Sequence, residues 1–378
     1  MTNPTLRSAA VEPFVLRVDD DVLDDLHARL DRARHLPASP GRPWSALDQG
    51  HLRELSRAWR VYDWRSREAW LAGHPQVLVD LGDVIIHAAH QRSSNDDAPA
   101  LLVMHGWPHT FAMQLDFADQ LPDFHVVVAS LPGFAFSSPF RSGEYTEAHL
   151  ARTMHGLVSA LGYERYLTYG EDVTANVNDL IAASYPDAVQ GIIVTHAHFP
   201  SAEERKHLDD PALAAFFARL EAGRYDASGY DHIQSTRPDT IAAALNDSPV
   251  GLLAWITEKF AEWSDTPHDE PLHLEDRITR DQILTDATIY WVTQSIASSF
   301  RPYFEEARDP DVIPEVLVPA AVHIQKHEHD YPESAARSFY KDLRVFDRLP
   351  EGGHFAVAEV PDAMAERVRD FARSLSLL

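Results

Sequence analysis

The sequence predicts an α/β protein in which a doubly wound, mostly parallel sheet is combined with an inserted helical lid and an N-terminal helical meander. Two observations carry this prediction. Strand-like runs alternate with helical segments over 76–198 and return at 315–349, and such alternation is typical of a parallel sheet. Between these regions lies a long stretch of helical, aromatic-rich segments, as expected of a lid over an active site.

The first region, 1–75, is predicted to be a meander that wraps the later core. Asp19 and Asp20 supply an N-cap and a negative first turn for an amphipathic helix at 19–35. A second helix is expected at 47–60. The aromatic residues that follow must pack on something, but the region offers no obvious chemistry.

The core is predicted in two parts, 76–198 and 311–378. The first part contains, in order, a hairpin at 76–87, strands at 100–104 and 124–130, a helix at 146–161, a strand at 166–170, a helix at 176–185 and a strand at 191–196. The second part adds strands at 315–324 and 343–349 and a closing helix at 361–375.

The lid is predicted at 199–310, between the two parts of the core. Its expected helices are 212–222, 239–245, 252–263 and 281–298. A helical insertion of this length between strands commonly covers an active site and controls access to it.

Composition restricts the class of protein. The chain has 378 residues, 45% hydrophobic and 24% charged, as in an ordinary soluble enzyme. A formal net charge of −25 argues against nucleic acid and anionic membranes as partners, because both require basic patches. The chain has no cysteine, so disulfides and thiolate metal sites are excluded. Because no run reaches the roughly 18 apolar residues that span a bilayer, and 1–13 has no apolar stretch, we expect a cytoplasmic protein.

Asp172 stands where a sheet-based hydrolase normally carries its nucleophile. A strand at 166–170 leads into a sharp turn, with the small residues Gly170 and Thr174 two positions before and after Asp172, and a helix follows. A serine there would attack a carbonyl carbon, whereas a carboxylate attacks an electrophilic saturated carbon and forms an ester. An aspartate after a strand is also a common helix N-cap, so this segment alone leaves both interpretations open.

A second motif, His105-Gly106-Trp107-Pro108, directly follows the apolar strand at 100–104. Such a turn brings backbone N–H groups to the nucleophile as one side of an oxyanion hole, and the N–H of Val173 supplies the other donor. Taken alone, the motif is equally an ordinary strand-terminal turn built on Gly and Pro.

The third motif, Gly352-Gly353-His354-Phe355, follows the last predicted strand. Two glycines allow a loop to bring the imidazole of His354 close to other backbone. His354 lies after Asp172 in the chain, as the order nucleophile, acid, histidine of the α/β-hydrolase fold requires, and with the other two motifs this makes it the candidate general base.

Taken together, these and further segments resemble the microsomal-type epoxide hydrolases of the α/β-hydrolase fold. The matching segments are Trp64-Arg65, 105–108, 130–137, the lid runs 229–240 and 247–252, and 352–356. The resemblance covers nearly the whole chain, and the lid runs are more specific than the general hydrolase motifs.

The resemblance implies two lid tyrosines that hydrogen-bond to the epoxide oxygen. By motif position these are Tyr230 and Tyr303. Ring opening releases an alkoxide, which leaves poorly unless a donor meets its charge. We also expect His105, Pro108 and Phe134 to line the substrate pocket.

The family's acid falls on Glu328 when counted along the segment after the strand at 315–324, but Asp330 is the alternative. The aromatic-Pro pair usual before that acid is replaced by Lys326-His327, which leaves the register open. Histidines in this segment could also suggest a metal site, although an acid loop accounts for them better. The sequence departs from the family again after Asp172, where Val173 and Thr174 replace the usual Trp and Gly.

The implied mechanism has two steps and uses no metal or organic cofactor. Asp172 attacks an epoxide carbon, and His354, oriented by Glu328, then activates water to hydrolyse the ester to a vicinal diol. The oxyanion is held by the N–H groups of Trp107 and Val173. The expected substrate is a small-molecule apolar or aryl epoxide. We also expect a homodimer and a role in secondary metabolism.

Two alternatives remain open at this point. A haloalkane dehalogenase would use the same aspartate nucleophile but needs N–H donors for a halide, a role that Trp107 could fill. A catalytically inactive hydrolase-fold binding protein would keep the scaffold without turnover. The two lid tyrosines favour the epoxide over the halide, and the complete set of catalytic side chains disfavours an inactive scaffold.

Overall fold

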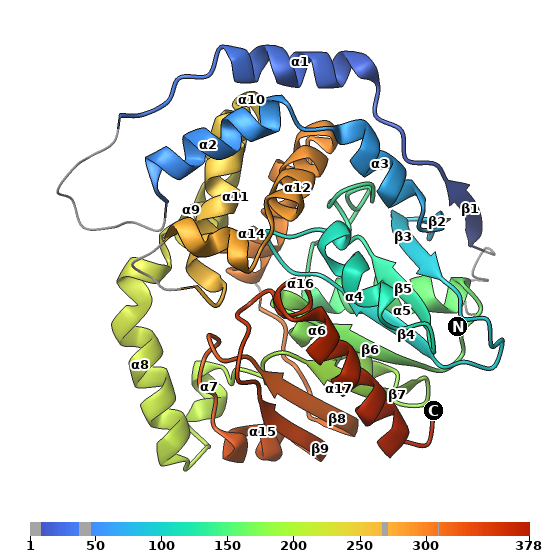
Figure 1. Cartoon of the computed structure of the whole chain (residues 1–378). Coiled ribbons are helices and arrows are strands. Elements are labelled where there is room, and N and C mark those ends of the chain that lie inside the picture. Colours follow the sequence, from blue (N-terminus) through green and yellow to red (C-terminus); the bar gives the residue numbers. More distant parts are fainter. Residues whose placement is uncertain (1–8, 38–46, 267–270, 309) are drawn as a thin grey trace.

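The computed structural model describes residues 9–37, 47–266, 271–308 and 310–378 (Figure 1). Within these residues nine strands form one sheet in the order β1-β2-β3-β5-β4-β6-β7-β8-β9. The strands are β1 (Ala10–Phe14), β2 (Gln76–Asp80), β3 (Ile85–Gln91), β4 (Ala100–Met104), β5 (His125–Ala129), β6 (Tyr166–Gly170), β7 (Val189–Val194), β8 (Val316–Ile324) and β9 (Tyr340–Arg348).

From β5 to β9 the sheet is parallel, while β1, β2, β3 and β5 pair antiparallel. The central strands are buried on both faces, and neighbouring residues pack into different cores. On β4, Leu102 and Met104 join one hydrophobic cluster, whereas Leu101 and Val103 join the other. Continuous burial of this kind requires helices on both sides of a parallel sheet, so the predicted doubly wound architecture is confirmed.

Helices cover each face of the sheet. On one face α5 (Glu147–Ala160) and α6 (Val173–Ser184) pack together, and α6 lies against β6, β7 and β8. On the other face α4 (Leu115–Asp119) packs against α16 (Ala356–Glu359) and α17 (Pro361–Ser374), beside the short helix η1 (Phe111–Gln114). A further helix, α15 (Glu333–Phe339), joins β8 to β9. Because these helices clamp β4 and β6, the carboxyl ends of both strands are held at one edge of the sheet.

The N-terminal region differs from the prediction in one respect. Its helices α1 (Asp20–Asp31), α2 (Gln49–Arg60) and α3 (Trp64–Ala72) are preceded by β1, which pairs with β2 at the edge of the sheet. No strand is predicted here, because β1 is short, mostly exposed and contains Pro13, features that suit an edge strand.

The lid lies between β7 and β8, and the N-terminal helices lie over it (Figure 1). Its helices are α7 (Ala202–Arg205), α8 (Pro211–Ala227), α9 (Gly229–Thr236), α10 (Pro238–Asp247), α11 (Pro249–Trp263), η2 (Pro271–Asp276), α12 (Arg280–Thr293), α13 (Ile296–Ser299) and α14 (Arg301–Glu306). The single helix predicted at 281–298 is wrong: Gln294 adopts a left-handed conformation, with φ 53°, and separates α12 from α13.

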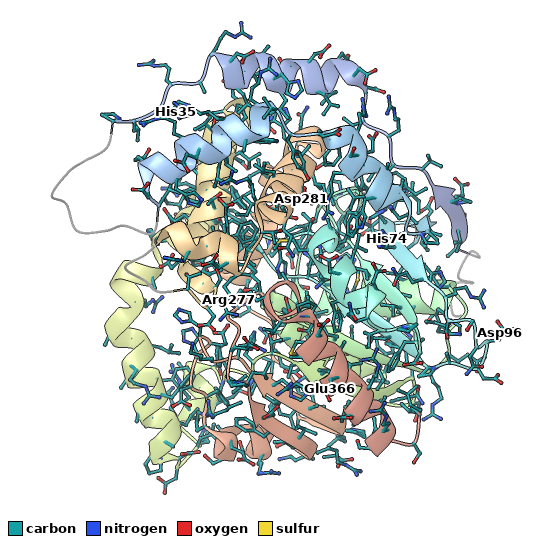
Figure 2. All side chains as sticks on the ribbon, viewed as in Figure 1. His35, His74, Asp96, Arg277, Asp281 and Glu366 are labelled. Atoms are coloured by element: carbon teal, nitrogen blue, oxygen red, sulfur yellow. The ribbon has the colours of Figure 1, made fainter. Side chains whose placement is uncertain are left out.

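The N-terminal helices are tied to the lid by side chains that fill the space between them (Figure 2). The indole N–H of Trp59 on α2 donates to the Thr288 hydroxyl of α12 at 2.8 Å. On α12, Asp281 accepts a hydrogen bond from the Tyr62 hydroxyl at 2.7 Å and pairs with Arg67 at 3.1 Å. None of the helices in the described ranges combines the length and the apolarity that crossing a membrane would take.

Candidate active site

Asp172 lies at the turn between β6 and α6, in a backbone conformation that few non-glycine residues adopt, with φ 54° and ψ −137°. Such a conformation costs about 1–3 kcal/mol and persists only where its surroundings impose it. Thr174, which replaces the family's glycine, closes the turn: its hydroxyl donates to the Glu171 carbonyl at 2.6 Å and accepts from the Glu171 N–H at 3.0 Å.

Gly106 allows the chain after β4 to pass directly against the nucleophile. A Cβ added at Gly106 would lie 2.2 Å from the Cβ of Asp172, so no larger residue fits without displacement. This close approach places the N–H of Trp107 3.3 Å from Asp172 Oδ1. The N–H of Val173 also interacts with the carboxylate. The two backbone donors predicted for the oxyanion hole thus both contact the carboxylate of Asp172.

His354 faces the second oxygen of the carboxylate. Its Nε2 lies 3.2 Å from Asp172 Oδ2, at ion-pair distance but outside hydrogen-bond alignment. Its Nδ1 lies 2.8 Å from Glu328 Oε2. The structure therefore brings Glu328 to the imidazole, whereas Asp330 is exposed and pairs with Arg348 at 2.5 Å.

The two glycines before His354 are explained by a second close approach. A Cβ on Gly353 would lie 2.5 Å from the carbonyl oxygen of Trp263, at the end of α11. The N–H of His354 donates to that same carbonyl at 2.9 Å. The carboxyl of Glu359 accepts from the N–H groups of Gly353 and Phe355, so the loop is fixed on both sides of the imidazole.

The electrostatics of the three groups are coupled. Burial alone would raise the pKa of Asp172, but the contact with His354 and the N–H groups of Val173 and Trp107 outweigh it, and that pKa is lowered. Burial opposes the charged form of Glu328 as well, yet His354 holds its pKa well below the ordinary value. Although burial disfavours the imidazolium, Asp172 and Glu328 raise the pKa of His354 well above 6.5. The free site is therefore an ionised carboxylate beside an imidazolium.

The two predicted lid tyrosines meet above the nucleophile. Tyr230 comes from α9 and Tyr303 from α14; their ring centroids are 5.9 Å apart, and their hydroxyls interact. The ring of Tyr230 stacks on Trp107 at 5.5 Å with an interplanar angle of 5°. Burial, followed by the nearby carboxylate of Asp172, raises the pKa of Tyr230, so this phenol stays protonated and can donate.

These groups border a cavity of about 200 Å³ at the boundary of core and lid. The side chains around it are Trp107, Phe134, Glu147, Asp172, Val173, Asn176, His196, Phe199, Tyr230, Ser299, Pro302, Tyr303 and Glu306. Of the three predicted pocket residues, Phe134 is in this set and His105 and Pro108 are outside it. His105 is fully buried beneath the site, where its ring bonds to the backbone of Gly106 and Leu131.

Five polar lining residues were not found from the sequence: Glu147, Asn176, His196, Ser299 and Glu306. Glu147 begins α5, where an acidic residue is ordinary because it complements the helix dipole. Glu306 ends α14 in a segment whose prediction concerned only Tyr303. Nothing in the local pattern distinguishes these residues from surface charges, and only the fold brings them together.

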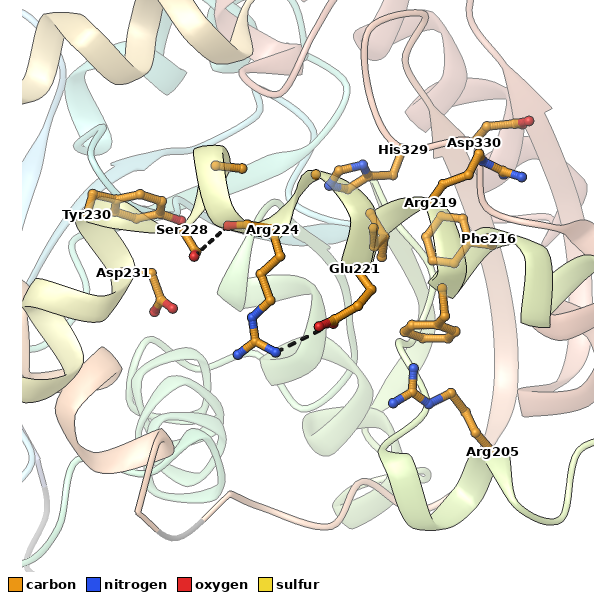
Figure 3. Close-up of a pocket in the computed structure, with 14 residues that line it drawn as sticks. Arg205, Phe216, Arg219, Glu221, Arg224, Ser228, Tyr230, Asp231, His329 and Asp330 are labelled. Atoms are coloured by element: carbon orange, nitrogen blue, oxygen red, sulfur yellow. Dashed lines mark hydrogen bonds and ion pairs between the residues drawn. The ribbon is translucent and has the colours of Figure 1, made fainter.

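A larger groove of about 810 Å³ lies on the other side of Tyr230 (Figure 3). Tyr230 and Asp231 of α9 lie at one end of it, and His329 and Asp330, in the loop that follows β8, also border it. Tyr230 lines both spaces. Across the described parts of the chain, no group of three or more histidine or acidic side chains is placed to hold a metal. Glu328 links the loop after β8 to the site through its contact with His354.

This architecture, with a strained aspartate at the strand–helix turn, a histidine–acid pair and a helical lid, defines an α/β-hydrolase with a carboxylate nucleophile. The family described as "alpha/beta hydrolase fold" matches residues 99–236, and that described as "Epoxide hydrolase N terminus" matches residues 11–113. The chain belongs to the epoxide hydrolase family, in its microsomal-type branch.

Three relatives support this placement. A protein of Stigmatella aurantiaca named "Putative epoxide hydrolase" is 32% identical, over 97% of this chain and 85% of its own. "Epoxide hydrolase 1" of Sus scrofa is 28% identical, over 97% of this chain and 91% of its own. The crystal structure of juvenile hormone epoxide hydrolase from the silkworm Bombyx mori superposes with a TM-score of 0.88 at 26% identity, covering 97% of this chain and 95% of that one.

Proposed function

We propose that this enzyme converts an apolar or aryl epoxide to a vicinal diol through an ester formed on Asp172. The observation that carries the proposal is the placement of two protonated phenols, Tyr230 and Tyr303, in the same cavity as an ionised carboxylate. A nucleophile and proton donors sharing one small cavity are what opening of a neutral three-membered ether requires.

In the first step, Asp172 Oδ2 attacks one epoxide carbon while Oδ1 stays with the N–H of Trp107. The C–O bond of the ring breaks, and the leaving oxygen takes a proton from Tyr230 or Tyr303. The products are a hydroxyalkyl ester and a phenolate, so charge is conserved. The hydrogen bond between the two phenols spreads the developing charge over both.

In the second step, water replaces the alkyl group. Esterification removes the charge of Asp172, which had helped to raise the pKa of His354, so the imidazolium gives up its proton more readily, and that proton returns the phenolate to a phenol. Neutral His354 then takes a proton from water, and the hydroxide attacks the carboxyl carbon of the ester. The oxyanion forms on Oδ1, facing the N–H groups of Trp107 and Val173. Its collapse breaks the bond between the carboxyl carbon and Oδ2, and the leaving alkoxide takes the proton of the His354 imidazolium and departs as the diol. The carboxyl proton left on Asp172 passes to His354, which restores the carboxylate and the imidazolium.

Haloalkane dehalogenation is a weaker second candidate. Among the described residues the buried indole Nε1 of Trp107 has no hydrogen-bond partner, and Trp107 lines the cavity, so this N–H could face a halide. The two phenols are superfluous to that reaction. Incubation with a bromoalkane should therefore release no bromide, whereas styrene oxide should give phenylethanediol.

A single turnover in H₂¹⁸O tests the covalent step. Enzyme in excess over styrene oxide should place ¹⁸O in the Asp172 carboxylate, and the first diol released should carry unlabelled oxygen, because water attacks the ester and not the epoxide. His354→Gln should accumulate the ester, visible as added mass on the peptide containing Asp172. Label in the first diol but none in Asp172 would mean direct attack by water, and this mechanism would then be abandoned.

Other expectations stay predictions from the sequence. They are the cytoplasmic location, the homodimer, the role in secondary metabolism, and the lack of nucleic-acid or membrane partners.

A further inference from the structure

Two carboxylates besides the nucleophile face the active-site cavity, one from the core and one from the lid. Glu147 is the first residue of α5, and Glu306 is the last residue of α14. The mechanism above uses neither. The cavity lining includes no lysine or arginine, and its one basic side chain is His196. Both ring nitrogens of His196 face backbone carbonyls, at 2.9 Å from Asp172 and 3.2 Å from Ala197, so the ring is engaged with the cavity wall.

Glu147 is only 7% exposed, and one of its two carboxylate oxygens has a hydrogen-bond donor. Its Oε1 accepts a hydrogen bond from Asn176 Nδ2 at 2.9 Å, while no side chain or backbone N–H of the described residues donates to Oε2. Burying a carboxylate is costly unless a donor or a cation meets it. Glu147 is nine-tenths buried and lines the cavity. Its second oxygen is therefore available to a cation or a donor bound there.

Glu306 occupies a more open position. The residue is exposed to solvent, yet its side chain also lines the cavity, which places it where the cavity opens. Nearby cations are engaged elsewhere: Arg301 pairs with Glu305 at 2.6 Å, and Arg308 lies 3.4 Å above the ring of Phe304. No ion pair of Glu306 exists among the described residues.

The charged groups around Glu147 and Glu306 are also negative. Asp311, whose carboxylate accepts from the Ala148 N–H at 2.7 Å, adds its negative field to both glutamates, and Asp172 acts on both as well. Asp231 of α9 acts on Glu306. Burial first, and then these charges, raise the pKa of Glu147 to about 8. The pKa of the more exposed Glu306 is also raised, first by partial desolvation in the cavity wall and then by the same charges. Near neutral pH Glu147 retains a proton that a bound cation would release.

We propose that the cavity selects an epoxide whose apolar body carries a cationic ammonium group, held between Glu147 and Glu306. The walls fit such a group in a second way: five aromatic side chains line the cavity, and ring faces attract quaternary ammonium ions. This inference rests on the proposed hydrolysis, because it names the substrate class of the same site. It makes Glu147 and Glu306 specificity determinants and assigns them no proton transfer.

The test uses two epoxides of equal shape. Glycidyltrimethylammonium carries N⁺ where 2-(2,2-dimethylpropyl)oxirane has a quaternary carbon, so their comparison isolates charge. The wild-type enzyme should show the higher kcat/KM for the cation. Glu147→Gln and Glu306→Gln should each lower the ratio of the two kcat/KM values by about 10-fold or more, the usual weight of a charge-assisted contact. Glu305→Gln, on the same helix but outside the lining, is the matched control and should keep the wild-type ratio.

Binding of inert ligands separates this inference from the proposed function. Calorimetry with choline and its neutral analogue 3,3-dimethylbutanol should show tighter binding of choline, with proton release that disappears in the double variant. Hydrolysis of both epoxides without preference for the cation would overturn the inference and keep the function. Binding of choline without hydrolysis of any epoxide would overturn the function alone. Equal loss of both epoxide activities in the two glutamine variants would assign them a structural role and overturn the inference.

Discussion

At the scale of single residues, the site depends on how one imidazole changes its proton affinity during the cycle. His354 sits between two carboxylates, of which Asp172 is 3.2 Å and Glu328 is 2.8 Å away. The first loses its charge when the ester forms and the second does not. His354 can thus be an imidazolium during alkylation and a base during hydrolysis, with Glu328 retaining orientation and charge throughout.

Glu328→Gln should therefore alter hydrolysis of the ester more than its formation. Burial disfavours the imidazolium, and the charge of Glu328 opposes this by raising the pKa of His354, so removing the charge lowers that pKa. Hydrolysis requires neutral His354 and speeds up as pH rises through its pKa, so this limb should move to lower pH. Above that pKa, the maximal rate of ester hydrolysis should fall about 10²- to 10³-fold, because His354 is then a weaker base and is no longer oriented by Glu328.

Rapid-quench measurement of ester decay across pH checks this prediction. Asp330→Asn, two residues along the same loop but exposed and paired with Arg348, is the control and should keep the wild-type profile. A limb that stays in place, or moves to higher pH, would contradict the assigned role of Glu328.

How far the site could be predicted depends on how local its signals are. Asp172 and His354 stand in short motifs whose glycines meet specific steric demands, so they could be recognised from the sequence. For the acid that orients His354, the sequence left a choice between Glu328 and Asp330, because the register of the loop is set by its packing and not by residue type. Glu147 and Glu306 lie 159 positions apart with no motif between them, and only the docking of lid on core joins them.

At the scale of elements, the turn after β4 and the turn after β6 are interlocked. Gly106→Ala would place its Cβ 2.2 Å from the Cβ of Asp172, and backbone must move to relieve this contact. Displacing a nucleophile by about 1 Å can cost roughly 100-fold in rate, and the clash should cost about 3 kcal/mol of stability.

Turnover of styrene oxide and thermal unfolding measure these two effects. Gly223→Ala in α8 is the matched control, because no atom lies within 4 Å of its added Cβ and alanine favours a helix. Unchanged activity in Gly106→Ala, with the control also unchanged, would show that the two turns are not interlocked.

The elements that sequence patterns predicted are those with a strong period. The strand at 100–104 matches β4, since it is apolar throughout, and the helix at 146–161 corresponds closely to α5. The missed elements have weak local signals. β1 is stabilised by pairing with a strand 62 or more residues away along the chain, and the break at Gln294 occurs at a residue without a strong preference for that conformation.

At the scale of the whole molecule, buried acids oppose stability at alkaline pH. Burial raises the pKa of Asp286 and Glu359 to about 8 and that of Glu171 to about 7. Unfolded acids titrate near 4, so above that pH the native state holds extra protons and stability falls as pH rises toward 8. Buried His87 and His105, with pKa values lowered to about 3 and about 4, have the opposite effect, but only up to about pH 6.5.

The melting temperature should consequently decline from pH 6.5 to pH 8.5, where the acids act unopposed. Asp286→Asn should reduce this decline and raise the melting temperature more at pH 8.5 than at pH 6.5. Its Oδ1 accepts from the N–H and the hydroxyl of Thr110, contacts an amide oxygen can keep, while no described donor reaches Oδ2. A surface change, Asp96→Asn, is the control. A melting temperature that rises over this range would refute the prediction.

The junction of α2 with α12 through Trp59 and Thr288 also bears on how the protein is made. The N-terminal helices pack on lid helices that the ribosome adds more than 200 residues later, since Trp59 and Thr288 are 229 positions apart. During synthesis the apolar faces of α1 and α2 stay exposed to solvent until the lid has been translated. Nascent chains stalled before Thr288 should therefore be bound by chaperones, whereas chains stalled after the lid has emerged should not.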